Sequence, residues 1–153
     1  MISPETLRRY PFFAGLQAAA FKDIAMLGDD ITLEPGEWLF HEGDDATYLF
    51  LIEEGSIDLK VKLGGPAARY ADLETLVPGE IVGWSALIEP YVFTLGAVAT
   101  SHARLIRLDA AALQALMDKD CEVGYALAKN LALVLSQRLS NLRTQFVSMM
   151  PDA

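Results

Sequence analysis

Cysteine and histidine are scarce in this chain, which has one cysteine, Cys121, and two histidines, His41 and His102. A single cysteine excludes an internal disulfide and is typical of reducing compartments, so we expect a cytoplasmic protein. These three side chains do not have the spacing of a metal site. Ser85 lies in a Gly-Trp-Ser-Ala-Leu stretch that lacks the second glycine of the turn presenting a catalytic serine. We therefore expect no metal and no enzymatic activity.

Positive charge and long apolar runs are also lacking. Lysine and arginine number 12 against 21 acidic residues, for a net charge of -9. This balance argues against direct nucleic-acid binding, which depends on positive charge facing phosphates. No uninterrupted apolar run approaches the ~18 residues that a membrane span needs, and the first residues do not resemble a secretory signal. We expect neither a nucleic acid nor a membrane as a partner.

Hydrophobic residues, by contrast, make up 52% of the 153 residues. This length predicts one domain with a substantial core, residues 1–153, and the apolar excess predicts an oligomer interface. The patterns divide the chain into short N-terminal helices in two pieces over 1–28, strands over 29–108, and helices over 109–150. Asp109 is expected to cap the first C-terminal helix, and Asp118 or Asp120 the longer one.

The middle of the chain has the pattern of short strands. Ile57, Leu59, Val61 and Leu63 alternate with polar residues, as in a strand with one buried face. Glycine-containing turns separate this run from similar ones at near-regular spacing. The fold class is therefore expected to be mainly β with flanking α, with the strands in an antiparallel sandwich or barrel.

The long C-terminal helix carries more apolar surface than one small domain needs. One line of side chains recurs at steps of three and four residues, and a second line widens it: Leu127, Leu131, Leu135, Leu139, Leu142 and Phe146, then Val123, Ala128, Ala132 and Val134. We predict a homodimer through the helix from Val123 to Phe146. The alternative is a helix packed wholly on its own domain.

The stretch 79–94 stands at the centre of the chain. Gly79 and Gly83 interrupt an apolar run and permit backbone angles that other residues avoid. Ser85 is predicted to cap a short helix over residues 86–88, whose free N–H groups could hold an anion. A tight connection with a serine cap is the alternative.

The order of these motifs resembles the cyclic nucleotide-binding domain of catabolite-activator-type regulators, kinase regulatory subunits and gated channels. A Gly-Glu pair, an apolar pair, Glu-Gly-Asp and an apolar strand ending in glycine occupy 36–55, and a second Gly-Glu pair occupies 79–80. The resemblance extends from about Leu16 to Arg143. It implies an antiparallel double-stranded β-helix, a jelly-roll-like β-roll, with a long C-terminal dimerisation helix.

The phosphate-binding cassette, 79–94, departs from the pattern of that family, which is Phe/Ile-Gly-Glu-Leu/Ile-Ala-Leu, a short loop, then Pro-Arg-x-Ala-Thr. In the family the glutamate accepts the ribose hydroxyl and the arginine pairs with the cyclic phosphate. Trp84 here replaces the glutamate and Tyr91 the arginine, whereas the matching positions are Gly83, Ala86, Leu87, Pro90 and Thr94. Losing both contacts weakens nucleotide binding by at least ~3–6 kcal/mol.

The aromatic replacements suggest a changed pocket. We expect Trp84, Tyr91 and Phe93 either to collapse into the former nucleotide site or to bind a different small molecule. The candidate ligand-binding set is Gly83, Trp84, Ser85, Ala86, Leu87, Tyr91, Phe93 and Thr94. No cofactor is required by the sequence; the candidates are a cyclic nucleotide or another small molecule.

Two functions remain open. The first is a sensor domain that signals through its C-terminal helix to an effector protein, with a ligand other than classical cyclic AMP or cyclic GMP. A variant of it binds cyclic nucleotide through a non-standard arginine: Arg69, Arg104 or Arg107. The second is a ligand-free dimerisation scaffold. Catabolite-activator-type regulators continue into a DNA-binding domain, whereas this sequence stops at Ala153, so a partner or a following segment must supply the output.

Overall fold

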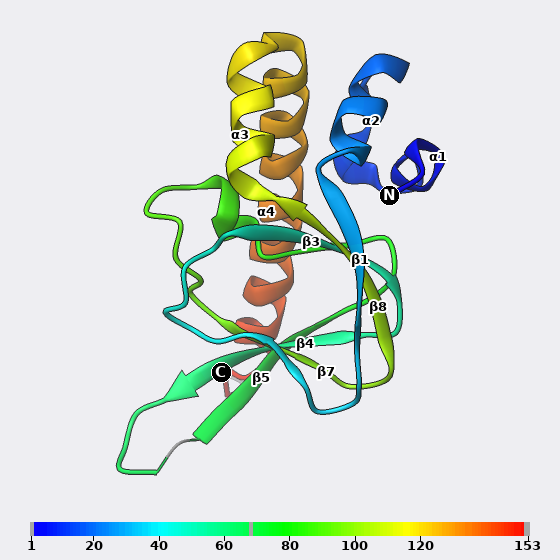
Figure 1. The fold of residues 1–153 in the computed structure, drawn as a ribbon. Helices are drawn as coiled ribbons and strands as arrows, with labels where there is room; N and C mark the ends of the chain where they lie inside the picture. Colours follow the sequence, from blue (N-terminus) through cyan, green and yellow to red (C-terminus); the bar gives the residue numbers. More distant parts are fainter. Residues whose placement is uncertain (1, 68, 152–153) are drawn as a thin grey trace.

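Two four-stranded antiparallel sheets form the body of the protein in a computed structural model that describes residues 2–67 and 69–151 (Figure 1). The strand orders are β1-β8-β3-β6 and β2-β7-β4-β5. The strands are β1 Gly28–Leu33, β2 Trp38–Phe40, β3 Tyr48–Glu54, β4 Ile57–Leu63, β5 Arg69–Leu76, β6 Ile81–Val82, β7 Gly96–Ala99 and β8 Ala103–Asp109. This arrangement confirms the expected fold class, mainly β with flanking α.

The helices lie toward the two ends of the chain, apart from one short helix between β6 and β7. They are α1 Pro4–Leu7, the 3-10 helix η1 Pro11–Phe13, α2 Ala18–Ala25, the 3-10 helix η2 Trp84–Leu87, α3 Ala110–Lys119 and α4 Cys121–Ser148. In Figure 1, α4 lies beside α3 and continues behind the sheets toward β4 and β5. The predicted boundaries of the single domain and its three segments stay predictions, and residues 1, 152 and 153 lie outside the described residues.

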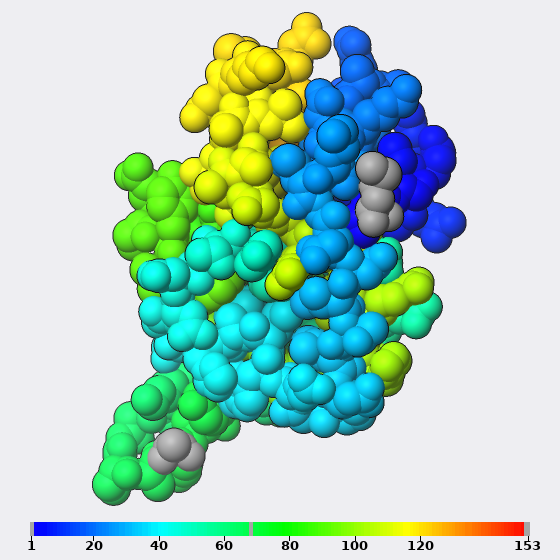
Figure 2. All heavy atoms as spheres, viewed as in Figure 1, coloured from blue at the N-terminus to red at the C-terminus, as the bar shows by residue number. Residues whose placement is uncertain are grey.

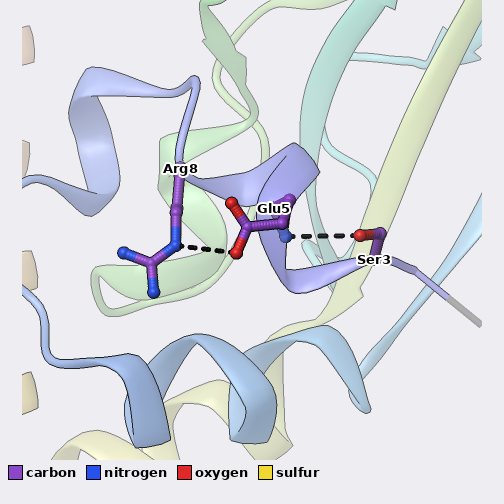
Figure 3. Close-up of polar contacts among 3 residues, drawn as sticks. All are labelled: Ser3, Glu5 and Arg8. Atoms are coloured by element: carbon purple, nitrogen blue, oxygen red, sulfur yellow. Dashed lines mark hydrogen bonds and ion pairs between the residues drawn. The ribbon is translucent and has the colours of Figure 1, made fainter.

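The N-terminal segment forms three pieces, so the expectation of two is wrong. Ser3 begins α1, where its Oγ accepts a hydrogen bond from the Glu5 N–H at 3.3 Å (Figure 3). Arg8 Nε pairs with Glu5 Oε1 at 3.2 Å in the same turn. Pro11 does not simply interrupt the helix: it opens η1, because its fixed φ suits a first helical position.

Helix caps in the C-terminal part follow the sequence closely. The Asp109 carboxylate accepts a hydrogen bond from the Ala112 N–H at 2.8 Å, which confirms the predicted cap of α3. Asp120, one of the two predicted residues, caps α4 by accepting from the N–H groups of Glu122 and Val123. These caps fix the residue at which β8 ends and α3 begins, and the residue at which α3 ends and α4 begins.

The strands at the centre of the first sheet are buried on both faces. In β3, Leu49 and Leu51 pack with the helices, whereas Phe50 and Ile52 pack between the two sheets. This explains why the sequence of β3 is a continuous apolar run rather than an alternating one. β4 alternates because only one of its faces is covered, and the β4–β5 hairpin stands out from the body in Figure 2.

Candidate functional site

The cassette, residues 79–94, contains β6 and η2 and precedes β7, and its backbone turns at Gly83. Gly83 has a φ of +87°, and a Cβ atom on it would lie 2.9 Å from the Phe93 ring. Glycine is therefore required for both the left-handed backbone and the space. Gly83 is also the N-cap residue of η2, which begins at Trp84. The predicted helix over 86–88 with a Ser85 cap is wrong, because the turn starts two residues earlier and has no side-chain cap.

Aromatic rings pack against one another at the cassette. Phe93 stacks on Phe40 with ring centroids 3.6 Å apart and planes 7° from parallel. Phe50 extends the stack at 6.1 Å from Phe40. The cavity that remains here is about 20 Å³ and is lined by Phe40, Leu59, Gly83, Trp84, Ser85, Phe93, Thr94, Leu95 and Arg138. A cavity of this size holds about one water molecule, which is too small for a nucleotide base or sugar.

The structure brings together part of the predicted set. Five predicted residues line the small cavity: Gly83, Trp84, Ser85, Phe93 and Thr94. Ala86 is instead buried between the sheets, and Leu87 packs with the helix-side cluster. Tyr91 lies in the following loop with a φ of +57°, and its carbonyl accepts the Ala46 N–H at 2.8 Å. A ligand-binding role for any of these residues stays a prediction.

None of the arginines considered from the sequence lies at this pocket. Arg104 pairs with Glu53 at 2.8 Å and with Glu54 at 3.2 Å. Arg107 pairs with Asp29 at 2.8 Å, and its guanidinium lies 4.7 Å from the Tyr48 ring centroid. Arg69 is exposed at the start of β5.

Sequence reasoning missed the arginine that does border the pocket, Arg138 of α4. Its guanidinium donates a hydrogen bond to the Ile81 carbonyl, two residues before Gly83. Burial lowers the pKa of the Arg138 guanidinium, although Glu74 and Glu80 act in the opposite direction. The sequence does contain a signal for this role: Arg138 lies seven positions, about two helical turns, after Leu131, so its charged side chain is on the face of α4 that packs against the roll.

Phe93 is one of the three aromatic residues expected from the sequence to collapse into the former nucleotide site or to bind a small molecule, whereas its stacking partner, Phe40, was not identified. Counting from Pro90, Phe93 stands where the family pattern has alanine. The Phe93 ring stacks on Phe40, which an alanine methyl group at this position is too short to do.

Within residues 2–67 and 69–151, no group of three or more histidine, cysteine, aspartate or glutamate side chains could hold a metal ion. Over the same part of the chain, no helix combines the length and apolar character needed to cross a bilayer.

Comparisons with known proteins agree with the fold. The family model for the cyclic nucleotide-binding domain matches residues 30–120. A curated protein of Rhodopseudomonas palustris named "Putative potassium channel protein" is 30% identical over 116 residues. The match covers 76% of this chain, and this chain spans only 27% of that protein's length.

Solved structures extend the similarity over almost the whole chain. A "Putative Cyclic nucleotide-binding protein" from Geobacter metallireducens is 34% identical with a TM-score of 0.82, covering 91% of this chain and 99% of that one. The N-terminal domain of a transcriptional regulator from Streptomyces coelicolor is 28% identical with a TM-score of 0.69, covering 97% of each. The fold, the ordered motifs and the family match together show that this chain belongs to the cyclic nucleotide-binding domain family.

Proposed function

We propose that this chain is a non-enzymatic regulatory domain whose roll pocket is filled by its own side chains, so that cyclic AMP and cyclic GMP are not its ligands. The stack of Phe93 on Phe40, at 3.6 Å, is the observation that carries this proposal. The space left beside the stack is about 20 Å³. A nucleotide would have to displace a buried aromatic ring before making any contact of its own.

The chemistry of the cassette supports the same conclusion. Trp84 and Tyr91 cannot make the charge-assisted hydrogen bonds that glutamate and arginine make in the family. Each such bond contributes ~1.5–3 kcal/mol, so the missing pair corresponds to a loss of roughly 10²–10⁴ in affinity. The displacement of Phe93 would weaken binding further.

The output of the domain is proposed to pass through α4. Leu139 and Phe146 are 67% and 65% exposed, and Leu135, between Leu131 and Leu139, continues their face of the helix. An exposed apolar stripe on a helix of 28 residues fits pairing with a second copy around a two-fold axis. Effector proteins of the kind suggested by the channel and regulator relatives would then read the state of this helix pair.

Isothermal titration calorimetry tests the proposal. Titration of the protein with cyclic AMP and cyclic GMP, each up to about millimolar concentration, is expected to give no saturable heat. A cooperative thermal transition of the same sample is the control for a folded protein. A dissociation constant in the micromolar range for either nucleotide would overturn the proposal.

A further inference from the structure

A second, open cavity shares one lining residue, Arg138, with the small cavity of the roll. Its volume is about 310 Å³, at the lower end of the range of small-molecule sites. It is formed by η1, by the β5–β6 region and by the middle of α4. The lining residues are Pro11, Phe12, Glu74, Gly79, Glu80, Ile81, Leu133, Val134, Gln137, Arg138 and Asn141.

The walls of this cavity, which we call the side cavity, are apolar with charged groups of both signs. Phe12, Ile81 and Val134 provide the apolar part. The positive group is the Arg138 guanidinium, for which no carboxylate within the described residues lies inside 4.0 Å. Among the residues that the structure describes, its one hydrogen-bond partner is the Ile81 carbonyl. A guanidinium has five N–H donors, so Arg138 keeps donors for a ligand.

Two carboxylates supply the opposite charge. Glu74 accepts a hydrogen bond from the Asn141 amide at 3.2 Å, and Glu80 accepts from the Val77 N–H at 2.8 Å. The Gln137 side chain donates to Asn141 at 3.0 Å, which holds the amide of Asn141 in place beside Glu74. Each carboxylate retains acceptor sites, because an ionised carboxylate has about four lone-pair positions.

These groups call for a ligand with charges of both signs. A carboxylate is the natural bidentate partner for a guanidinium, and an ammonium group is the natural partner for carboxylates. The apolar walls fit a hydrocarbon side chain between the two charged groups. We propose that the side cavity binds a small zwitterion of the amino-acid class, with its carboxylate on Arg138, its ammonium toward Glu74 and Glu80, and an apolar side chain.

The side cavity is independent of the proposed function. At 100° per residue, Leu133 and Gln137 lie on the opposite side of α4 from Leu135, Leu139 and Phe146. A second copy bound along that apolar stripe would therefore leave the side cavity open. A ligand in the side cavity would contact Arg138. Arg138 in turn donates a hydrogen bond to the carbonyl of Ile81, which belongs to the cassette.

Titration calorimetry with L-leucine and L-phenylalanine is the test. Each probe is expected to bind saturably. For L-leucine, removal of one charge is expected to weaken binding at least ~10-fold, because one charge-assisted contact is lost. The matched compounds are 4-methylpentanoate, which lacks the ammonium, and 3-methylbutylamine, which lacks the carboxylate.

A variant pair locates the binding. Leu133 is 63% exposed at the mouth of the side cavity, so Leu133→Trp adds bulk there without disturbing the core. Leu63→Trp makes the same change at a 40% exposed position of β4, away from both the cavity and the proposed helix pair. Loss of L-leucine binding in Leu133→Trp alone supports the site.

Absence of saturable binding by both amino acids at millimolar concentration would overturn the inference. Equal affinity in Leu133→Trp and the unaltered protein would overturn it as well, and so would equal affinities of L-leucine and its two matched compounds. The outcome of the cyclic nucleotide titration does not decide this inference, because that titration concerns the roll pocket, whose lining residues other than Arg138 are different.

Discussion

At the scale of single residues, one aromatic side chain decides whether the roll can hold a ligand. Phe93 is 5% exposed and stacks on Phe40, which is 7% exposed. The exchange of the two charged cassette residues removes contacts, but the ring of Phe93 removes the space. Restoring the charges alone should therefore not restore binding.

Three substitutions test this order of effects. Trp84→Glu with Tyr91→Arg is expected to bind no cyclic AMP by calorimetry, whereas addition of Phe93→Ala is expected to give measurable binding because the roll is emptied. Phe93→Ala should lower stability by about 3–5 kcal/mol in urea unfolding. As a control, Phe12→Ala is added to the double variant in place of Phe93→Ala, because it removes a buried ring that lies outside the roll. Binding by the double variant with Phe93 intact would contradict the prediction.

Tyr10 provides a residue-scale prediction about pH. Its hydroxyl donates to the Ile52 carbonyl at 2.8 Å, and burial, aided by Glu53, raises the pKa of Tyr10 to about 12. The folded state thus favours the neutral phenol. The contribution of Tyr10 to the free energy of unfolding is therefore complete below pH 10 and is lost as the pH rises through 12. Tyr10→Phe should cost about 1 kcal/mol at pH 7, since Ile52 keeps the Gly79 N–H as a partner.

Urea unfolding of both proteins between pH 7 and pH 12 measures this effect. The stability difference between the unaltered protein and Tyr10→Phe should shrink above pH 10. A difference that stays constant over that range would show that the phenol does not titrate with folding.

At the scale of elements, Asn130 and Arg138 help to attach α4 to the rest of the domain, alongside the hydrogen bonds of Asn141 and Gln145 to β5. The Asn130 amide donates to the carbonyls of Phe12 and Ala14, at 2.8 and 2.9 Å. Arg138 makes one hydrogen bond to Ile81, and burial lowers the pKa of its guanidinium. The neutral side chain forms two bonds without desolvating a charge, so it should contribute more to stability.

Single substitutions rank the two attachments. Asn130→Ala is expected to lower the free energy of unfolding by about 1–3 kcal/mol, because two carbonyls lose their donor. Arg138→Met keeps the apolar stem and should lower it by less. Arg143→Met, at an exposed position of the same helix, serves as the control in urea unfolding. A larger loss for Arg138→Met than for Asn130→Ala would contradict this ranking.

The elements themselves were largely predictable from the sequence. Alternation identified β4, and the aspartates before Ala110 and Cys121 marked the starts of α3 and α4. The start of η2 was not predictable by the cap rule, because the left-handed Gly83 makes the turn without a side-chain cap. Placing Phe93 against Phe40 requires knowing which strands face each other across the roll, and a local pattern does not contain this information.

At the scale of the whole molecule, we predict a symmetric pair of copies that contact through α4. Leu139→Glu with Phe146→Glu places charges in the proposed interface and should raise the dimer dissociation constant on the order of 100-fold or more, because apolar burial is lost from both copies. Sedimentation equilibrium measures the constant. Leu133→Glu, at a similarly exposed position on the other side of α4, should leave it unchanged.

A monomer at all concentrations for the unaltered protein would contradict the pairing. So would an equal response of the dimer to Leu133→Glu and to the double substitution. The net charge of -9 adds a general repulsion between copies, so both experiments belong at moderate ionic strength.

The central claim is that the roll is closed to cyclic nucleotides, and a nuclear magnetic resonance titration of the ¹⁵N-labelled protein with cyclic AMP tests it most directly. The account predicts that the amide signals of Gly83, Ser85 and Ala86 stay in place up to millimolar nucleotide. Saturable shifts of these three signals at micromolar nucleotide would show that the ligand displaces the Phe93 ring. The claim that the roll is closed to cyclic nucleotides would then be wrong.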